Sequence, residues 1–149
     1  MLDSEGYLKL IDFGTAKKME NDRTLTLMGS LHYIAPEVLD GRGHGYEADI
    51  FSLGVVFYEL ICGSLPHGDE EEDPVKVYKK IMTQKVMFPD HITQPSLKKL
   101  IRCLMRKNPI KRQRYTFEFI KQHEVFTGIN WKSLLKKKYF PPHNPKLLG

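Results

Sequence analysis

Two short motifs in this sequence could do chemistry together. Asp12 lies in an Asp-Phe-Gly tripeptide, and an Ala-Pro-Glu tripeptide follows at residues 35–37. A carboxylate such as that of Asp12 can hold Mg²⁺ on the phosphates of a nucleotide, because Mg²⁺ binds through one or two carboxylates together with phosphate oxygens. The chemistry that this predicts is phosphoryl transfer. An isolated Asp-Phe-Gly could instead form a turn after a strand. The Ala-Pro-Glu motif at residues 35–37 favours the metal-binding role of Asp12 over this alternative.

The elements that must position these motifs are mostly helices. Residues 1–11 alternate Leu8 and Leu10 with a lysine around a Ser-Glu-Gly turn, which predicts a β-hairpin. Residues 15–31 are polar, basic and rich in threonine without any period, which predicts a long loop. Helices are predicted after Pro36, over 47–62, from Pro74, from Ser96 and over 117–123. The predicted fold class is therefore mainly α with a small β-hairpin.

The helix predicted over 47–62 differs from the others. It is apolar nearly all round, which is typical of a helix buried in the middle of a domain. It also contains Glu59 and is too short to cross a bilayer, so we expect no transmembrane segment. Cys62 and Cys103 lie far apart, which fits neither a disulfide framework nor a zinc site, and a cytoplasmic location is expected.

Composition excludes few classes of function. The chain has 149 residues, 41% of them hydrophobic, which is enough for one domain with a core. The net charge of +5 comes mainly from the second half of the chain. A basic patch can meet nucleic acid. Here the cations alternate with apolar residues at helical spacing, so a solvated helix face is expected and nucleic acid is not an expected partner.

Five motifs occur in a fixed order along the chain. They are Lys-Leu-Ile-Asp-Phe-Gly (9–14), Gly-Ser-Leu-His-Tyr-Ile-Ala-Pro-Glu (29–37), Asp-Ile-Phe-Ser-Leu-Gly (49–54), Asn-Pro-Ile-Lys-Arg (108–112), and His-Glu-Val-Phe followed by Ile-Asn-Trp (123–131). With these motifs the chain resembles the C-terminal lobe of a eukaryotic Ser/Thr protein kinase of the AGC group, most of all the cGMP-dependent type. The resemblance implies a portion of the kinase C-lobe at 1–126 and the start of the AGC C-terminal extension at 127–149.

The resemblance implies roles for the first half of the chain. Asp12 would bind Mg²⁺ and, through it, ATP. Phe13 would pack behind Asp12, and Gly14 would let the backbone turn. Thr26 resembles the activation-loop phosphosite, and Lys17 matches one basic partner of its phosphate.

The resemblance also implies roles in substrate binding for two residues. Ser30 stands in the loop that cradles the substrate hydroxyl, although Leu31 and His32 after it depart from the commoner Pro-Glu pair. Glu59 resembles the acid with which basophilic AGC kinases bind an arginine of the substrate, and its alternative is an ion pair inside the fold.

Three more residues would be structural. Glu37 would form a buried ion pair with Arg112. Asp49 would accept backbone hydrogen bonds from the catalytic loop, and a carboxylate is also favoured there because the helix N-terminus is positive.

Several parts of a kinase are not found in this sequence. It holds no glycine-rich loop before the Asp-Phe-Gly, no phosphate-binding lysine and no catalytic-loop aspartate. We therefore expect a fragment that is inactive alone, whose missing partner is the N-lobe of the same kinase. The parent would phosphorylate Ser or Thr in basic, arginine-containing proteins or peptides. The alternatives are a non-catalytic kinase remnant that acts as an interaction module, and an AGC kinase without cyclic-nucleotide control.

Overall fold

The computed structural model describes residues 1–19, 24–25 and 29–143. Thr26, the predicted phosphosite, lies outside the described residues. The chain divides into two compact units. The terminal unit comprises Met1–Lys17 and Phe126–Gly149, and the central unit comprises Lys18–Val125.

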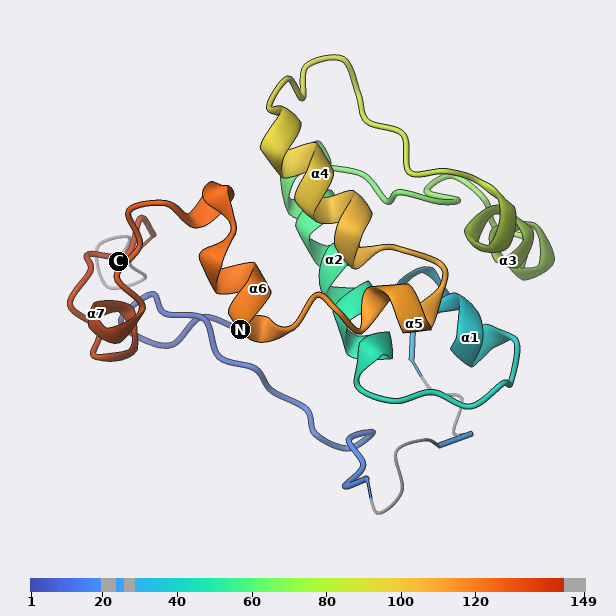
Figure 1. The fold of residues 1–149 in the computed structure, drawn as a ribbon, viewed down its shortest axis with the longest axis horizontal. Helices are drawn as coiled ribbons and strands as arrows, with labels where there is room; N and C mark the ends of the chain where they lie inside the picture. The colour runs from blue at the N-terminus through green and yellow to red at the C-terminus, as the bar shows by residue number, and fades with distance from the viewer. Residues whose placement is uncertain (20–23, 26–28, 144–149) are drawn as a thin grey trace. The chain divides into compact units, whose positions relative to one another are not determined.

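Helices make up the regular structure of the described residues (Figure 1). They are α1 (Pro36–Leu39), α2 (Glu47–Cys62), α3 (Pro74–Thr83), α4 (Pro95–Leu104), α5 (Pro109–Arg112), α6 (Phe117–Gln122) and α7 (Trp131–Leu135), with the 3₁₀ helices η1 (Leu31–Tyr33) and η2 (Glu124–Phe126). Within the central unit, α2 packs against α4, α5 and η1, and α3 packs against η1 and α1. None of the helices described has the length and apolar character needed to cross a membrane.

Local sequence signals account for the ends of these helices. Proline occupies the first turn of α1, α3, α4 and α5, where its missing N–H costs no helical hydrogen bond. The side chain of Asp73 accepts a hydrogen bond from the N–H of Val75 at 2.9 Å and so caps α3. Asn108 caps α5 in the same way through the N–H of Lys111, at 3.0 Å. Gly63 ends α2 in the left-handed region, with φ of 71°.

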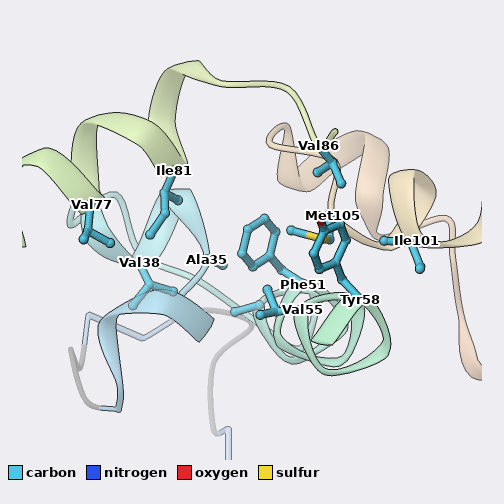
Figure 2. Packing of buried hydrophobic residues seen from close by; sticks show 11 residues of the cluster. Ala35, Val38, Phe51, Val55, Tyr58, Val77, Ile81, Val86, Ile101 and Met105 are labelled. Atoms are coloured by element: carbon cyan, nitrogen blue, oxygen red, sulfur yellow. The ribbon is translucent and has the colours of Figure 1, made fainter. Parts of the chain in front are cut away.

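The core of the central unit forms around α2 (Figure 2). Its labelled members are Ala35, Val38, Phe51, Val55, Tyr58, Val77, Ile81, Val86, Ile101 and Met105. Gly54 lets α4 approach α2 closely, because a Cβ atom there would lie 2.7 Å from Cγ of Met105. The helix is not buried all round, since Leu60 on another face is 76% exposed.

The predicted β-hairpin is wrong as a pair of strands. The turn exists, but the described residues form only an isolated antiparallel bridge between Leu2 and Leu8 at this point. Leu8 and Leu10 are more than 80% exposed, so the alternating leucines bury no apolar face. Without such a face nothing favours a longer ladder, because a two-stranded hairpin alone is marginal in water.

A lysine joins the two parts of the terminal unit. The Nζ atom of Lys137 donates to Asp3 Oδ2 at 2.8 Å and also to Glu5. It lies 5.2 Å from the ring centroid of Tyr7. The hydrogen bond from Lys137, helped by backbone N–H donors, lowers the pKa of Asp3 to about 2. No local pattern predicts this cluster, since Lys137 is more than 130 residues from Asp3 and Glu5.

Candidate functional site

Asp12 adopts an unusual backbone conformation. Its φ is 61°, in the left-handed region, where Asp and Asn are better tolerated than most residues. One carboxylate oxygen, Oδ1, accepts a hydrogen bond from the N–H of Gly14 at 3.2 Å. The side chain is therefore held at an exposed turn with Oδ2 outside this hydrogen bond. Phe13, expected to pack behind it, is 66% exposed.

Asp12 fits the role of a single metal ligand rather than of a complete site. The part of the chain that the structure describes contains no group of three or more His, Cys, Asp or Glu side chains able to hold a metal ion. Mg²⁺ is commonly bound by one or two carboxylates together with phosphate oxygens and water. One exposed carboxylate therefore fits a magnesium ion that a nucleotide brings with it.

A second constellation forms where η1 meets α2. The hydroxyl of Tyr33 donates to Glu59 Oε2 at 2.6 Å, and the hydroxyl of Ser52 donates to the carbonyl oxygen of Tyr33 at 2.7 Å. The hydrogen bond to Glu59, together with burial, raises the pKa of Tyr33 to about 12. Tyr33 thus stays protonated and fixes the Glu59 carboxylate, of which Oε1 takes no part in this bond. Sequence reasoning missed Tyr33, because nothing in a spacing of 26 residues signals such a contact.

Ser30 lies next to this constellation. It occupies the N-cap position of η1 and is exposed. Its carbonyl oxygen accepts a hydrogen bond from the N–H of Tyr33 at 3.0 Å, while its hydroxyl caps nothing. The two predicted substrate-binding residues, Ser30 and Glu59, therefore both accept hydrogen bonds from Tyr33.

Glu37 and Arg112 form the predicted ion pair, and it is buried. Arg112 is wholly inaccessible and Glu37 is 4% exposed. The Nη2 atom of Arg112 donates to Glu37 Oε1, Nη1 donates to the carbonyl of Arg106, and Nε donates to the carbonyl of Glu47 at 2.7 Å. The guanidinium also lies 5.3 Å from the ring centroid of Phe51. Burial lowers the pKa of Arg112, and the charge of Glu37 opposes that shift.

The remaining predicted residues, Lys17 and Asp49, belong to different units. Asp49 is exposed in the first turn of α2, where the positive end of the helix favours a carboxylate. Asp12 and Lys17 belong to the terminal unit, whereas Ser30, Glu59 and the buried ion pair belong to the central unit. The predicted roles of Asp49 and Lys17 stay predictions.

Comparison with known proteins places this arrangement in a family. The family described as "Protein kinase domain" matches residues 1–126. The chain belongs to the protein kinase domain family. The Asp-Phe-Gly turn, the η1–α2 junction and the buried ion pair all lie inside the matched residues.

Several characterised protein kinases are similar in sequence to this chain. The chain is 41% identical to the cGMP-dependent protein kinase of Plasmodium berghei over 145 residues. The aligned region covers 95% of this chain and 17% of that relative. It is 40% identical to the cGMP-dependent protein kinase of Toxoplasma gondii, covering 98% of this chain and 15% of that protein. It is also 40% identical to the cAMP-dependent protein kinase catalytic subunit PRKX of Mus musculus, covering all of this chain and 42% of that subunit. The chain thus spans about one sixth of the cGMP-dependent relatives.

Proposed function

We propose that this chain is the C-lobe portion of a Ser/Thr protein kinase of the cyclic-nucleotide-dependent type. The parent would transfer the γ-phosphate of ATP to Ser or Thr in arginine-containing substrates. The observation that carries this proposal is the family match over residues 1–126, in which Asp12 presents an exposed carboxylate. Residues 1–126 would form the C-lobe portion, and 127–149 would begin the C-terminal extension.

Each site residue then has a distinct task. ATP bound with Mg²⁺ supplies the phosphoryl group. Asp12 would hold the metal, and its hydrogen bond from Gly14 limits the directions in which the carboxylate can point. Phosphate on Thr26 would pair with cations such as Lys17 and order the loop.

Glu59 would bind an arginine of the substrate. Charge-assisted hydrogen bonds between a guanidinium and a carboxylate are strong and directional. Glu59 is half-buried on α2, and it accepts a hydrogen bond from the neutral hydroxyl of Tyr33 rather than from a cation. Among the described residues no ion pair engages Glu59, which favours the substrate role over an ion pair inside the fold.

Phosphoryl transfer by the full-length product of the gene tests the proposed function. We expect it to transfer ³²P from ATP to serine in an arginine-rich peptide when Mg²⁺ is present. The present chain alone should transfer none, because positioning by a catalytic loop and a phosphate-binding lysine supplies most kinase catalysis. Asp12→Asn in the full-length product is the matched inactive reference, since Asn tolerates positive φ. A full-length product without transferase activity would favour the non-catalytic remnant.

Substrate recognition gives a second prediction. In the active protein, Glu59→Gln should lower kcat/KM for a peptide with arginine two positions before the serine by about ten- to a hundredfold, because a hydrogen bond to a charged group contributes about 1.5–3 kcal/mol. A peptide with alanine at that position should lose little. The control is Glu70→Gln, which changes an exposed acid of the neighbouring acidic loop. Equal losses on both peptides would mean that Glu59 only supports the fold.

The alternative of an interaction module has one observation in its favour. Leu60 and Val56 expose apolar surface on α2. A partner protein could cover them. The missing part of the same kinase would cover them equally well, and a binding remnant has no use for a metal-binding carboxylate at Asp12.

A further inference from the structure

The outer side of α4 carries positive charge only. The helix contains Lys98, Lys99 and Arg102 and no aspartate or glutamate, and Arg106 follows two residues after its end. Lys98 is half-buried and the other three cations are exposed, while apolar residues of the same helix belong to the buried core. We call the surface formed by these four cations the α4 basic face.

The α4 basic face has no acidic partner within the described part of the chain, where none of its four cations takes part in an ion pair. The helix α3 differs in this respect, because its Lys76 and Lys80 both pair with Glu71, at 3.5 and 3.2 Å. Solvated helix faces usually mix charges of both signs. Like charges three or four residues apart on a helix repel each other, so an anion from outside would relieve this repulsion.

Two aromatic rings restrict the cations of this face. Lys98 Nζ lies 5.9 Å and Arg102 Cζ lies 5.0 Å from the ring centroid of Phe88. Arg106 Cζ lies 5.7 Å from the ring centroid of Tyr115. A cation is attracted to the face of an aromatic ring, so these side chains are held before any anion arrives. Binding then costs less side-chain entropy than it would with freely rotating lysines and arginines.

The surroundings of the face favour an acidic protein segment over other anions. Single-stranded nucleic acid binds by stacking its bases on aromatic rings, but Phe88 and Tyr115 already contact cations and pack against Tyr58 and Phe119, at centroid distances of 5.4 and 4.8 Å. Helices that lie on membranes also insert large apolar side chains, and residues 95–106 expose none. Carboxylates on a polypeptide need neither feature.

We propose that the α4 basic face binds an extended acidic segment of a partner protein. Lys98 and Arg102 are four residues apart on a helix, which separates them by about 6 Å along its axis. Alternate side chains of an extended peptide point the same way and lie about 6.5–7 Å apart, so alternating acids can meet successive cations. The planar guanidinium of an arginine can donate two hydrogen bonds to one carboxylate. The face uses neither Asp12 nor Glu59 and is independent of the kinase function proposed above.

A labelled acidic peptide tests this proposal. Fluorescence anisotropy follows a fluorescein-labelled peptide of alternating glutamate and glycine while the full chain is added. We expect saturable binding in dilute buffer, with a Kd on the order of 100 µM or below. The matched peptide with glutamine in place of glutamate should bind at least about tenfold more weakly, and so should the acidic peptide in about 0.5 M salt.

Variants matched in charge assign the binding to this face. The double variant Arg102→Gln with Arg106→Gln should weaken binding of the acidic peptide about tenfold or more. The control, Lys18→Gln with Lys79→Gln, removes the same charge from two exposed lysines outside the face and should change the Kd by less than about threefold. Lys99→Glu reverses one exposed charge of the face and should also weaken binding, which keeps the test valid if the double variant fails to fold.

Other occupants of the face are tested in parallel. Oligothymidine and vesicles of phosphatidylcholine with phosphatidylserine should each bind more weakly than the acidic peptide. The proposal is overturned if the acidic peptide does not saturate, if the glutamine peptide binds equally well, or if the control variant loses as much binding as the double variant. It is also overturned if either competing probe binds more tightly, or if the chain alone forms a dimer that the double variant abolishes, which would make a second copy the occupant.

Discussion

Replacing Arg112 by methionine should destabilise the central unit by about 3–5 kcal/mol, since removing one member of a buried ion pair leaves the other as an uncompensated charge. Here the orphan is Glu37, which is almost inaccessible. The same change also removes the guanidinium hydrogen bonds to the carbonyl oxygens of Glu47 and Arg106. One side chain thus joins α1, the start of α2 and the segment after α4, so the loss falls on three elements at once.

Urea unfolding followed by circular dichroism at 222 nm measures this effect. The signal comes mainly from the central unit, which holds α1 to α6, while the terminal unit contributes only the short helix α7 among the α-helices described. The only tryptophan, Trp131, lies in the terminal unit, so its fluorescence follows that unit separately. We expect a large fall in the urea midpoint of the dichroism signal for Arg112→Met.

Two further variants complete the comparison. Arg42→Met removes an ion pair whose arginine side chain is 74% exposed, and it should cost no more than about 1 kcal/mol. The double variant Glu37→Met with Arg112→Met should recover part of the loss, because hydrophobic replacement of a whole buried pair is often tolerated. Recovery should stay incomplete, since the hydrogen bonds from the guanidinium to two carbonyl groups stay lost. A loss for Arg112→Met no larger than that for Arg42→Met would contradict the role assigned to the pair.

Acidification should destabilise the central unit through His67. The folded pKa of His67 is lowered to about 4 from an ordinary value of 6.5, first by burial and then by the charge of Lys107. Between these values the unfolded chain binds a proton that the folded chain does not. Stability is therefore complete above pH 6.5 and falls as the pH drops toward 4, by about 3 kcal/mol at most.

The measurement is the free energy of unfolding by urea at pH 7.5, 6.5, 5.5 and 5.0, a window in which the carboxylates are still mostly ionised. His67→Phe removes the titrating group and should flatten the dependence over this range. His91→Gln is the matched control, because His91 is exposed and should leave the dependence unchanged. If the wild type and His67→Phe lose stability in parallel, the buried imidazole is not the cause.

Some of the fold could be predicted because the sequence marks it locally. The helix expected over 47–62 is observed as α2 (Glu47–Cys62), since a continuous apolar run without proline forms it and Gly63 ends it. Pro74 marks one more helix start, whereas the short helix α5 (Pro109–Arg112) was not predicted. The Glu37–Arg112 pair was predicted from a family motif and is present.

Other features could not be predicted because they depend on which polar atoms meet after packing. Periodicity identifies an apolar face but says nothing of the hydroxyl of Tyr33 reaching Glu59. The burial of His67 carries no local signal either, since its neighbours form a polar loop in sequence. The hairpin prediction went wrong for a related reason, because alternation of Leu8 and Leu10 indicates a face only if something covers it.

The contacts of Lys137 have a consequence for the order of folding. Asp3 and Glu5 cannot meet this lysine until more than 130 further residues have been synthesised. The central unit is one continuous stretch, Lys18–Val125, and needs no such wait. Closing long loops is slow, and domains commonly fold as the chain emerges from the ribosome. Asp3 and Glu5 would therefore be without this lysine on the nascent chain until the segment that contains Lys137 has been synthesised.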